Sequence, residues 1–157
     1  MADKAEGPAV DKDALLRITQ GLRRVDVGTY ALRIRLAEKL GIGTIDINAM
    51  AFVGEVDGMT PKALGNILSI TTGSVTAMVD RLESKGFMVR KPNPADRRSV
   101  FLHLSPAGTH AMQWANGHFA EAAKAVIQGS SDDAASSIAD FLEGIGQRLL
   151  AAASAPE

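Results

Sequence analysis

The sequence predicts a mainly α-helical chain that carries one small β-hairpin. In several long segments the apolar residues recur at spacings of three and four, which is typical of amphipathic helices. A single stretch, residues 99–104, alternates apolar with polar or aromatic side chains, as a half-buried strand does. With 157 residues the chain has the length of one domain and can form a core of its own.

The N-terminal part is predicted to be a tail followed by one long helix. Residues 1–10 contain glycine, proline and charges without periodicity, so we expect a disordered tail. Within residues 11–43 we expect an amphipathic helix, which Gly41 and Gly43 end. Its apolar stripe consists of Leu15, Ile18, Leu22, Val25, Thr29, Leu32, Leu36 and Leu40. A further helix begins at Thr44.

Two short helices follow, joined by a tight turn. Thr60 is suited to cap the first of them, with Pro61 at its first position, and Thr71 is suited to cap the second. The second helix should end at Gly86, because glycine favours the left-handed conformation that closes a helix. Its predicted buried stripe is Val75, Met78, Val79 and Leu82.

The next segment is predicted to be a projecting β-hairpin. Residues 87–91 and 99–104 have the composition of strands, and a charged turn from Pro92 to Arg98 separates them. Pro92 and Pro94 stiffen this turn and remove two backbone donors, so the hairpin should stand out as a finger.

Two further amphipathic helices complete the chain. One begins at Ser105-Pro106 and the other after Gly129. Their stripes are Met112, Ala115, Phe119, Ala122 and Val126, then Ile138, Phe141, Leu142, Ile145 and Leu149. A single copy of this chain has little left to cover these stripes, so we expect residues 11–43 and 109–154 to form a homodimer.

Residues 44–108 have the order of a winged helix-turn-helix, whose second helix fits the major groove of B-DNA, about 12 Å wide. Charge agrees with this interpretation. The chain as a whole has a net charge of -1, but residues 58–108 carry seven basic and three acidic side chains, a net +4. A basic centre between acidic flanks suits a protein that approaches phosphate with one face.

The run DRLESKGFMVRKPNPADRRSVFLHLSPAG, with the T/S-rich turn and helices before it, resembles the winged helix-turn-helix of MarR-type transcriptional regulators. Its most specific parts are Asp96-Arg97-Arg98 and Leu104-Ser105-Pro106-Ala107-Gly108. The resemblance implies a homodimer that binds double-stranded DNA at a palindromic operator. It also implies a small-molecule effector, such as an aromatic compound, in the crevice between the dimer helices and the DNA-reading part.

Candidate DNA contacts fall into two groups. For the major groove we expect the small side chains at the start of the second helix, with Arg81 as a longer contact to a base or phosphate. In the wing we expect Arg98 to enter the minor groove, with its guanidinium oriented by Asp96, while the other basic residues contact phosphates. The first group is Thr72, Gly73, Ser74, Thr76, Ala77 and Arg81, and the second is Arg90, Lys91, Asp96, Arg97 and Arg98. The alternatives are a solvated helix face and an Asp–Arg pair that only ties the hairpin together.

Other kinds of site find no support in the sequence. Cysteine is absent, and the histidines, His103, His110 and His118, lack further ligands at suitable spacing, so we expect no metal and no cofactor. No set of residues suggests a reaction class, so we expect no enzyme. No apolar run reaches the roughly 20 residues of a membrane span and no leader is present, so we expect a cytoplasmic protein.

Two functional hypotheses remain after the sequence analysis. The first is a dimeric, sequence-specific transcriptional regulator, more specifically a repressor that a small molecule releases from its operator. The second is a dimeric winged-helix module that binds protein and no operator. Salt dependence separates the two, because phosphate contacts make affinity fall steeply as salt rises.

Overall fold

The computed structural model describes residues 11–154, apart from the side chains of Arg97 and Ser154, so the predicted tail at residues 1–10 lies outside the described part. The elements in chain order are α1 (Lys12–Leu40), α2 (Thr44–Glu55), α3 (Pro61–Leu68), α4 (Thr72–Ser84), β1 (Met88–Asn93), β2 (Asp96–Leu104), α5 (Pro106–Ile127) and α6 (Asp132–Ser154). The predicted fold class, mainly α with one antiparallel hairpin, is confirmed.

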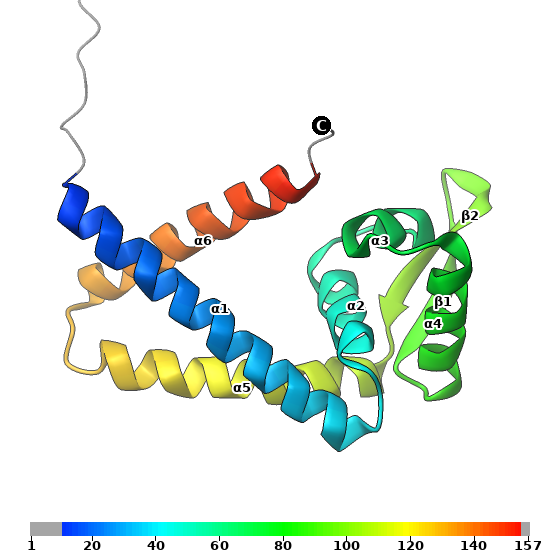
Figure 1. Cartoon of the computed structure of the whole chain (residues 1–157), viewed down its shortest axis with the longest axis horizontal. Coiled ribbons are helices and arrows are strands. Elements are labelled where there is room, and N and C mark those ends of the chain that lie inside the picture. Colours follow the sequence, from blue (N-terminus) through cyan, green and yellow to red (C-terminus); the bar gives the residue numbers. More distant parts are fainter. Residues whose placement is uncertain (1–10, 155–157) are drawn as a thin grey trace, which may run out of the picture.

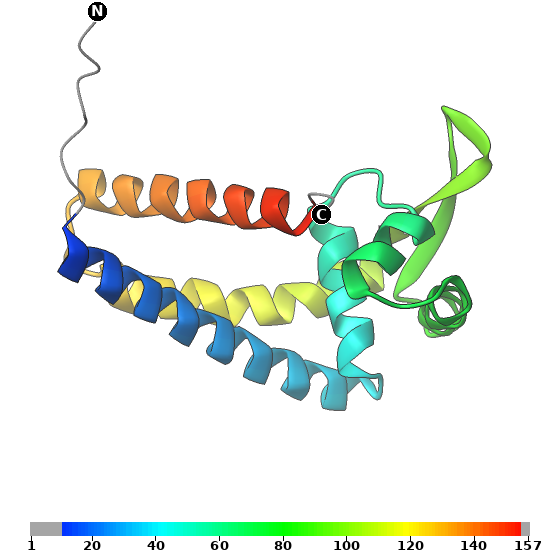
Figure 2. The same cartoon turned by 45° about the horizontal axis from the view of Figure 1, so that its top comes forward.

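The elements separate into a head and three long helices. The helices α2, α3 and α4 pack together with the hairpin at one end of the molecule, and we call residues 44–108 the head (Figure 1). From the head, α1, α5 and α6 extend to the other side as three rods (Figure 2). The hairpin of β1 and β2 projects away from these rods, as expected for a wing.

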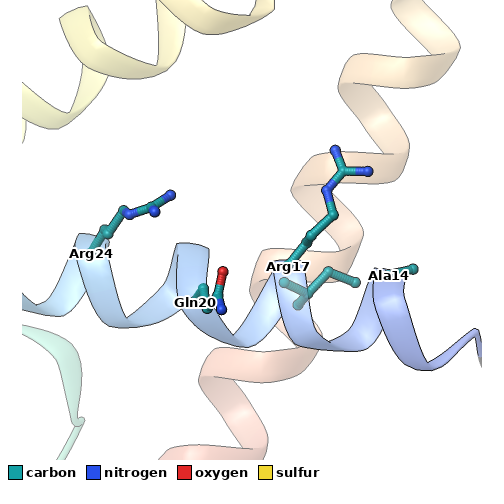
Figure 3. A pocket seen from close by; sticks show the side chains of 5 residues that line it. Ala14, Arg17, Gln20 and Arg24 are labelled. Atoms are coloured by element: carbon teal, nitrogen blue, oxygen red, sulfur yellow. The ribbon is translucent and has the colours of Figure 1, made fainter.

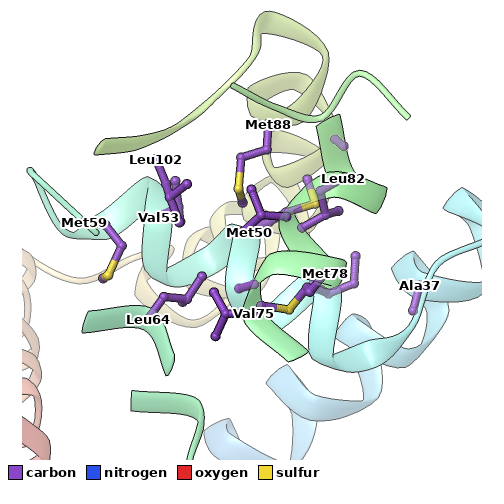
Figure 4. Packing of buried hydrophobic residues seen from close by; sticks show 14 of the residues in the cluster. Ala37, Met50, Val53, Met59, Leu64, Val75, Met78, Leu82, Met88 and Leu102 are labelled. Carbon is purple, nitrogen blue, oxygen red and sulfur yellow. The ribbon is translucent and has the colours of Figure 1, made fainter. Parts of the chain in front are cut away.

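The hydrophobic core lies inside the head. Side chains from α2, α3, α4 and the base of the hairpin converge there, and the C-terminal end of α1 and the start of α5 add to it (Figure 4). The predicted stripe of α4 is buried in full. Four methionines, Met50, Met59, Met78 and Met88, lie in this core and are at most 2% exposed.

Side-chain caps fix the helix starts as predicted. The Oγ1 of Thr60 accepts a hydrogen bond from the Ala63 amide at 3.1 Å, and the Oγ1 of Thr71 accepts one from the Ser74 amide at 3.2 Å. Each bond satisfies an amide that has no partner within the first helical turn. The turn between α3 and α4 is therefore set by two local threonine caps.

The wing differs from the sequence-based prediction in length. The strands continue to Asn93 and resume at Asp96, so only Pro94 and Ala95 form the turn that was expected to span 92–98. Pro92 is accommodated inside β1 because a two-stranded sheet consists of edge strands, which tolerate a missing donor. The register pairs Pro92 with Val100 and Asn93 with Asp96. The register therefore shifts between Pro92 and Asn93, and residues 97–99 of β2 are an irregular segment that it skips.

The three long helices leave large apolar side chains uncovered. On α1, Leu15 is 49% exposed and Val25 is 56% exposed, and on α5 Val126 is 80% exposed. On α6 the predicted stripe is also open, with Ile138, Phe141, Leu142 and Leu149 exposed. This apolar surface on α1, α5 and α6 is called the open helix face below, and nothing in the described part of the chain covers it.

A close backbone approach joins the wing to α5. The Ser105 hydroxyl accepts from the Gly108 amide at 3.0 Å and donates to the Gly86 carbonyl, while the Ser105 amide donates to the Phe87 carbonyl at 3.0 Å. A Cβ added at Gly108 would lie 2.0 Å from the Phe87 carbonyl oxygen. Only glycine therefore fits at this position without moving the backbone.

We predict that Gly108→Ala lowers the free energy of unfolding by about 3 kcal/mol or more, because the added methyl group meets backbone that cannot rotate away. Urea denaturation followed by circular dichroism measures the change. Gly117→Ala on the same helix is the matched control, since its added Cβ would meet nothing within 4 Å. It should leave stability unchanged or raise it by up to about 1 kcal/mol. Equal effects of the two variants would contradict the prediction.

Candidate nucleic-acid interface

The exposed face of α4 consists of the small side chains predicted to face a groove. The buried stripe of α4 turns Val75, Met78, Val79 and Leu82 inward. Thr72, Gly73, Ser74, Thr76 and Ala77 are all exposed, as predicted. Their contact with DNA stays a prediction. A surface of hydroxyls and single methyl groups at a helix N-terminus allows a close approach to backbone phosphates or base edges.

Two of these hydroxyls are already engaged within the helix. Thr76 donates its Oγ1 proton to the Thr72 carbonyl at 3.0 Å, and the Ser74 hydroxyl lies 2.9 Å from the Thr71 hydroxyl. These bonds hold the two side chains in place on the exposed face. The face is thus ordered before any ligand arrives.

Arg81 has a partner that the sequence analysis missed. Its Nε donates to Oδ2 of Asp46 at 3.1 Å and its Nη2 donates to Oδ1 at 2.5 Å, a bidentate ion pair between α4 and α2. Asp46 is 1% exposed, whereas the Arg81 side chain is 45% exposed. The bonds to Asp46 raise the pKa of Arg81 above its ordinary value, so the guanidinium stays charged. In the sequence Asp46 is an acidic residue in the first turn of a helix, which is a common position. No sequence signal distinguishes such a residue from one that also forms a buried ion pair with another helix.

Arg90, which we expected at a phosphate, is also held by carboxylates. It forms ion pairs with Glu83 and, at 2.7 Å, with Asp80, both on α4. Its backbone amide also donates to Glu83 at 2.9 Å. Arg90 therefore links β1 to α4 through its side chain and its backbone amide.

At the wing tip Asp96 makes a local contact to the backbone, and its expected role in orienting the Arg98 guanidinium on DNA stays a prediction. Oδ1 of Asp96 accepts a hydrogen bond from the backbone amide of Arg98 at 2.9 Å, and its carboxylate pairs with no guanidinium among the described side chains. The reason is local geometry, because an aspartate reaches the amide two residues ahead more easily than a long side chain. Asp96 therefore shapes the tip, and Arg98 is exposed on the segment that the strand pairing passes over.

After these pairings the unpaired positive charge of the head lies on α3, at the C-terminal end of α4 and on the wing. Among the described side chains of the head, Lys62, Lys85, Lys91 and Arg98 are exposed and form no ion pair. Arg97 lies beside Arg98 on β2. The head thus offers a small-residue helix face with cations on the neighbouring wing.

Other chemistry is not apparent in the described part of the molecule. Residues 11–154 contain no group of three or more histidine or acidic side chains that could hold a metal ion. His118 packs edge-on against Trp114, with ring centroids 4.6 Å apart, which is a packing role. None of the described helices is long and apolar enough to cross a membrane.

A shallow cavity of about 550 Å³ lies on α1, outside the head (Figure 3). Ala14, Arg17, Ile18, Gln20 and Arg24 line it, and the two arginines project to the same side of the helix. It does not coincide with the crevice that the family resemblance implies for an effector, because all its lining residues come from one helix.

Comparison with known proteins agrees with this architecture. The model of the MarR family matches residues 49–100, which run from α2 into the wing. An uncharacterized HTH-type transcriptional regulator of Bacillus subtilis, YcgE, is 36% identical over 83 residues, covering 53% of this chain and 54% of the relative. The chain thus spans about half the length of this relative.

Solved structures share the fold over nearly the whole chain. Transcriptional regulator Tm0710 of Thermotoga maritima superposes with a TM-score of 0.60 at 23% identity, covering 92% of this chain and 100% of the other. FabT of Streptococcus pneumoniae, in complex with DNA, gives a TM-score of 0.54 at 24% identity, covering 86% and 96%. At these identities the likeness establishes the fold. The head has the winged helix-turn-helix fold, and its resemblance to the MarR family, predicted from the sequence, is confirmed by the match over residues 49–100.

Proposed function

We propose that this protein is a sequence-specific, DNA-binding transcriptional regulator that acts as a homodimer on a palindromic operator. The observation that carries the proposal is the exposed N-terminal face of α4, which combines small hydroxyl side chains with an adjacent wing whose tip is basic. On this proposal α4 is the recognition helix, lying in the major groove, while the wing follows the backbone to the next minor groove.

The relatives support the regulatory class. YcgE and Tm0710 are described as transcriptional regulators, and FabT was solved in complex with DNA. A protein of this kind that occupies an operator represses transcription by excluding polymerase, so we propose a repressor that acts in the cytoplasm. Release by a small-molecule effector, aromatic compounds included, completes the proposal, because a ligand that favours another spacing of the two recognition helices would lower operator affinity.

A second copy of the chain is the proposed cover for the open helix face. Besides the exposed apolar side chains of this face, two of the helices that carry it have opposite net charges. The helix α1 carries seven basic and three acidic residues, whereas α6 carries four acidic and one basic. Arg17 and Arg24 of one protomer, beside the cavity on α1, would then meet acidic groups of the partner's α6. A two-fold dimer presents two heads to half-sites about one helical turn apart.

The first experiment selects binding sites for the purified protein from random duplex DNA and measures the best site at several salt concentrations. We expect an inverted repeat whose log affinity falls with log salt, with a slope of about -0.9 for each phosphate neutralised. Salt-sensitive binding without an enriched sequence would indicate a general DNA binder. No binding at low salt would contradict the proposal and favour the protein-binding winged-helix module.

We predict that Arg98→Ala weakens binding to the selected operator by roughly tenfold or more per half-site, because the wing loses its contact with the narrow groove. Fluorescence anisotropy measures the affinity, and circular dichroism checks the fold. Arg98→Lys is the matched variant, since it keeps the charge but lacks the planar guanidinium. It should recover the salt slope and only part of the affinity. An unchanged affinity of a folded Arg98→Ala protein would end the minor-groove role.

We predict that Phe141→Asp weakens the homodimer by about 100-fold, because it buries a carboxylate in the proposed interface. Sedimentation velocity over a range of protein concentrations measures the dissociation constant. Ser136→Asp adds the same charge to the polar face of α6 and serves as the control. Equal association of the two variants would show that the partner does not cover this part of α6.

A further inference from the structure

The buried carboxylate of Asp46 joins three parts of the molecule. Besides the two bonds from Arg81 on α4, its Oδ2 accepts the Gly43 amide at 2.9 Å. Gly43 is the N-cap of α2 and lies just after Gly41, where α1 ends. One carboxylate therefore connects the α1–α2 junction at the start of α2 with the recognition helix α4.

A second contact brings α4 to the same junction. The ammonium group of Lys85, at the C-cap of α4, lies 4.0 Å from the position a Cβ would take on Gly41. A cation at this place is favourable for α1, whose last carbonyls carry the negative end of the helix dipole. The C-terminal half of α4 is thus bonded to the α1–α2 junction through Arg81 and Asp46, and the Lys85 ammonium lies near the same junction.

The geometry at Arg81 also limits what its guanidinium can reach. Nε and Nη2 form the planar edge that suits a bidentate contact with a guanine, and both are bound to Asp46. The Nη1 group and the second N–H of Nη2 are left without a partner among the described groups. Arg81 follows Ala77 by one helical turn, so it stands at the border of the exposed face of α4.

We propose that Asp46 is a positioning residue for DNA reading, which fixes the orientation of α4 against the α1–α2 junction and keeps the Nε–Nη2 edge of Arg81 away from the bases. The inference rests on the proposed DNA-binding function. It makes the specificity of this protein depend on side chains of α4 that are held in a fixed orientation. A shift of α1 relative to α2 would move the Gly43 amide and be passed to α4 through this carboxylate.

The test compares Asp46→Asn with the wild-type protein on two duplexes, the operator selected by the wild type and a scrambled sequence of the same composition. The asparagine keeps an oxygen for the Gly43 amide but removes the charge that holds Arg81. We expect the ratio of operator to scrambled affinity to fall by about tenfold, and the salt slope on the scrambled duplex to steepen by about one unit per protomer as Arg81 reaches phosphate. Adding Arg81→Met to Asp46→Asn should abolish the steeper slope.

Asp57→Asn is the matched control, because it makes the same charge change on an exposed residue of the head. It should leave the ratio unchanged. Asp46→Asn could instead lower only the midpoint of thermal unfolding, while the ratio of operator to scrambled affinity of the folded variant stays within about twofold of the wild-type ratio. That result would overturn the positioning role and make Asp46 a purely structural residue.

Arg81→Lys keeps the inference testable should Asp46→Asn fail to fold. The lysine retains the charge but cannot form the two-point contact, so the ratio should again fall while the net charge is constant. An unchanged ratio would overturn the inference. If the wild-type protein enriches no sequence, the regulatory function and the positioning role are overturned together. If it enriches an operator but the ratio of operator to scrambled affinity is unchanged in the variants, only the positioning role is overturned.

Discussion

The ion pair between Asp46 and Arg81 is the constraint on which the geometry of the head depends. A carboxylate that is 1% exposed loses its hydration, and this cost is offset only when its oxygens accept good hydrogen bonds. Here two bonds come from Arg81 and one from the Gly43 amide. Because Arg81 lies on α4 and Gly43 caps α2, satisfying the carboxylate requires α4 and the start of α2 to keep one relative position.

Ion pairing also determines which charged side chains remain unpaired on the surface of the head. Arg81 and Arg90 are both engaged by carboxylates, so they hold α4 to the scaffold and to the wing. The helix consequently offers few charges of its own in the middle of the exposed face, and the unpaired cations lie mainly around it. A head of this kind suits recognition by shape and close contact, with the basic wing supplying the attraction to phosphate.

The three long helices follow a different physical rule. Their apolar side chains are exposed in a single copy of the chain. Removing such surface from water on association contributes a favourable free energy of about 25 cal/mol for each Å² buried. The complementary charges of α1 and α6 would add orientation to this non-directional attraction. In this proposal one interface both covers the apolar surface of the long helices and sets the distance between the two heads.

The sequence by itself determined the order of the helices, their caps, the buried stripe of α4 and the exposed small residues before Arg81. These features are local, since a threonine cap or a spacing of three and four acts within a few residues. The length of the strands and the partners of the arginines were decided by the tertiary structure. Asp46 and Arg81 are separated by 35 positions in the chain, and Arg90 meets α4 only after the chain has turned back in β1. Which carboxylate meets which guanidinium depends on distances between packed elements, and no local pattern records those distances.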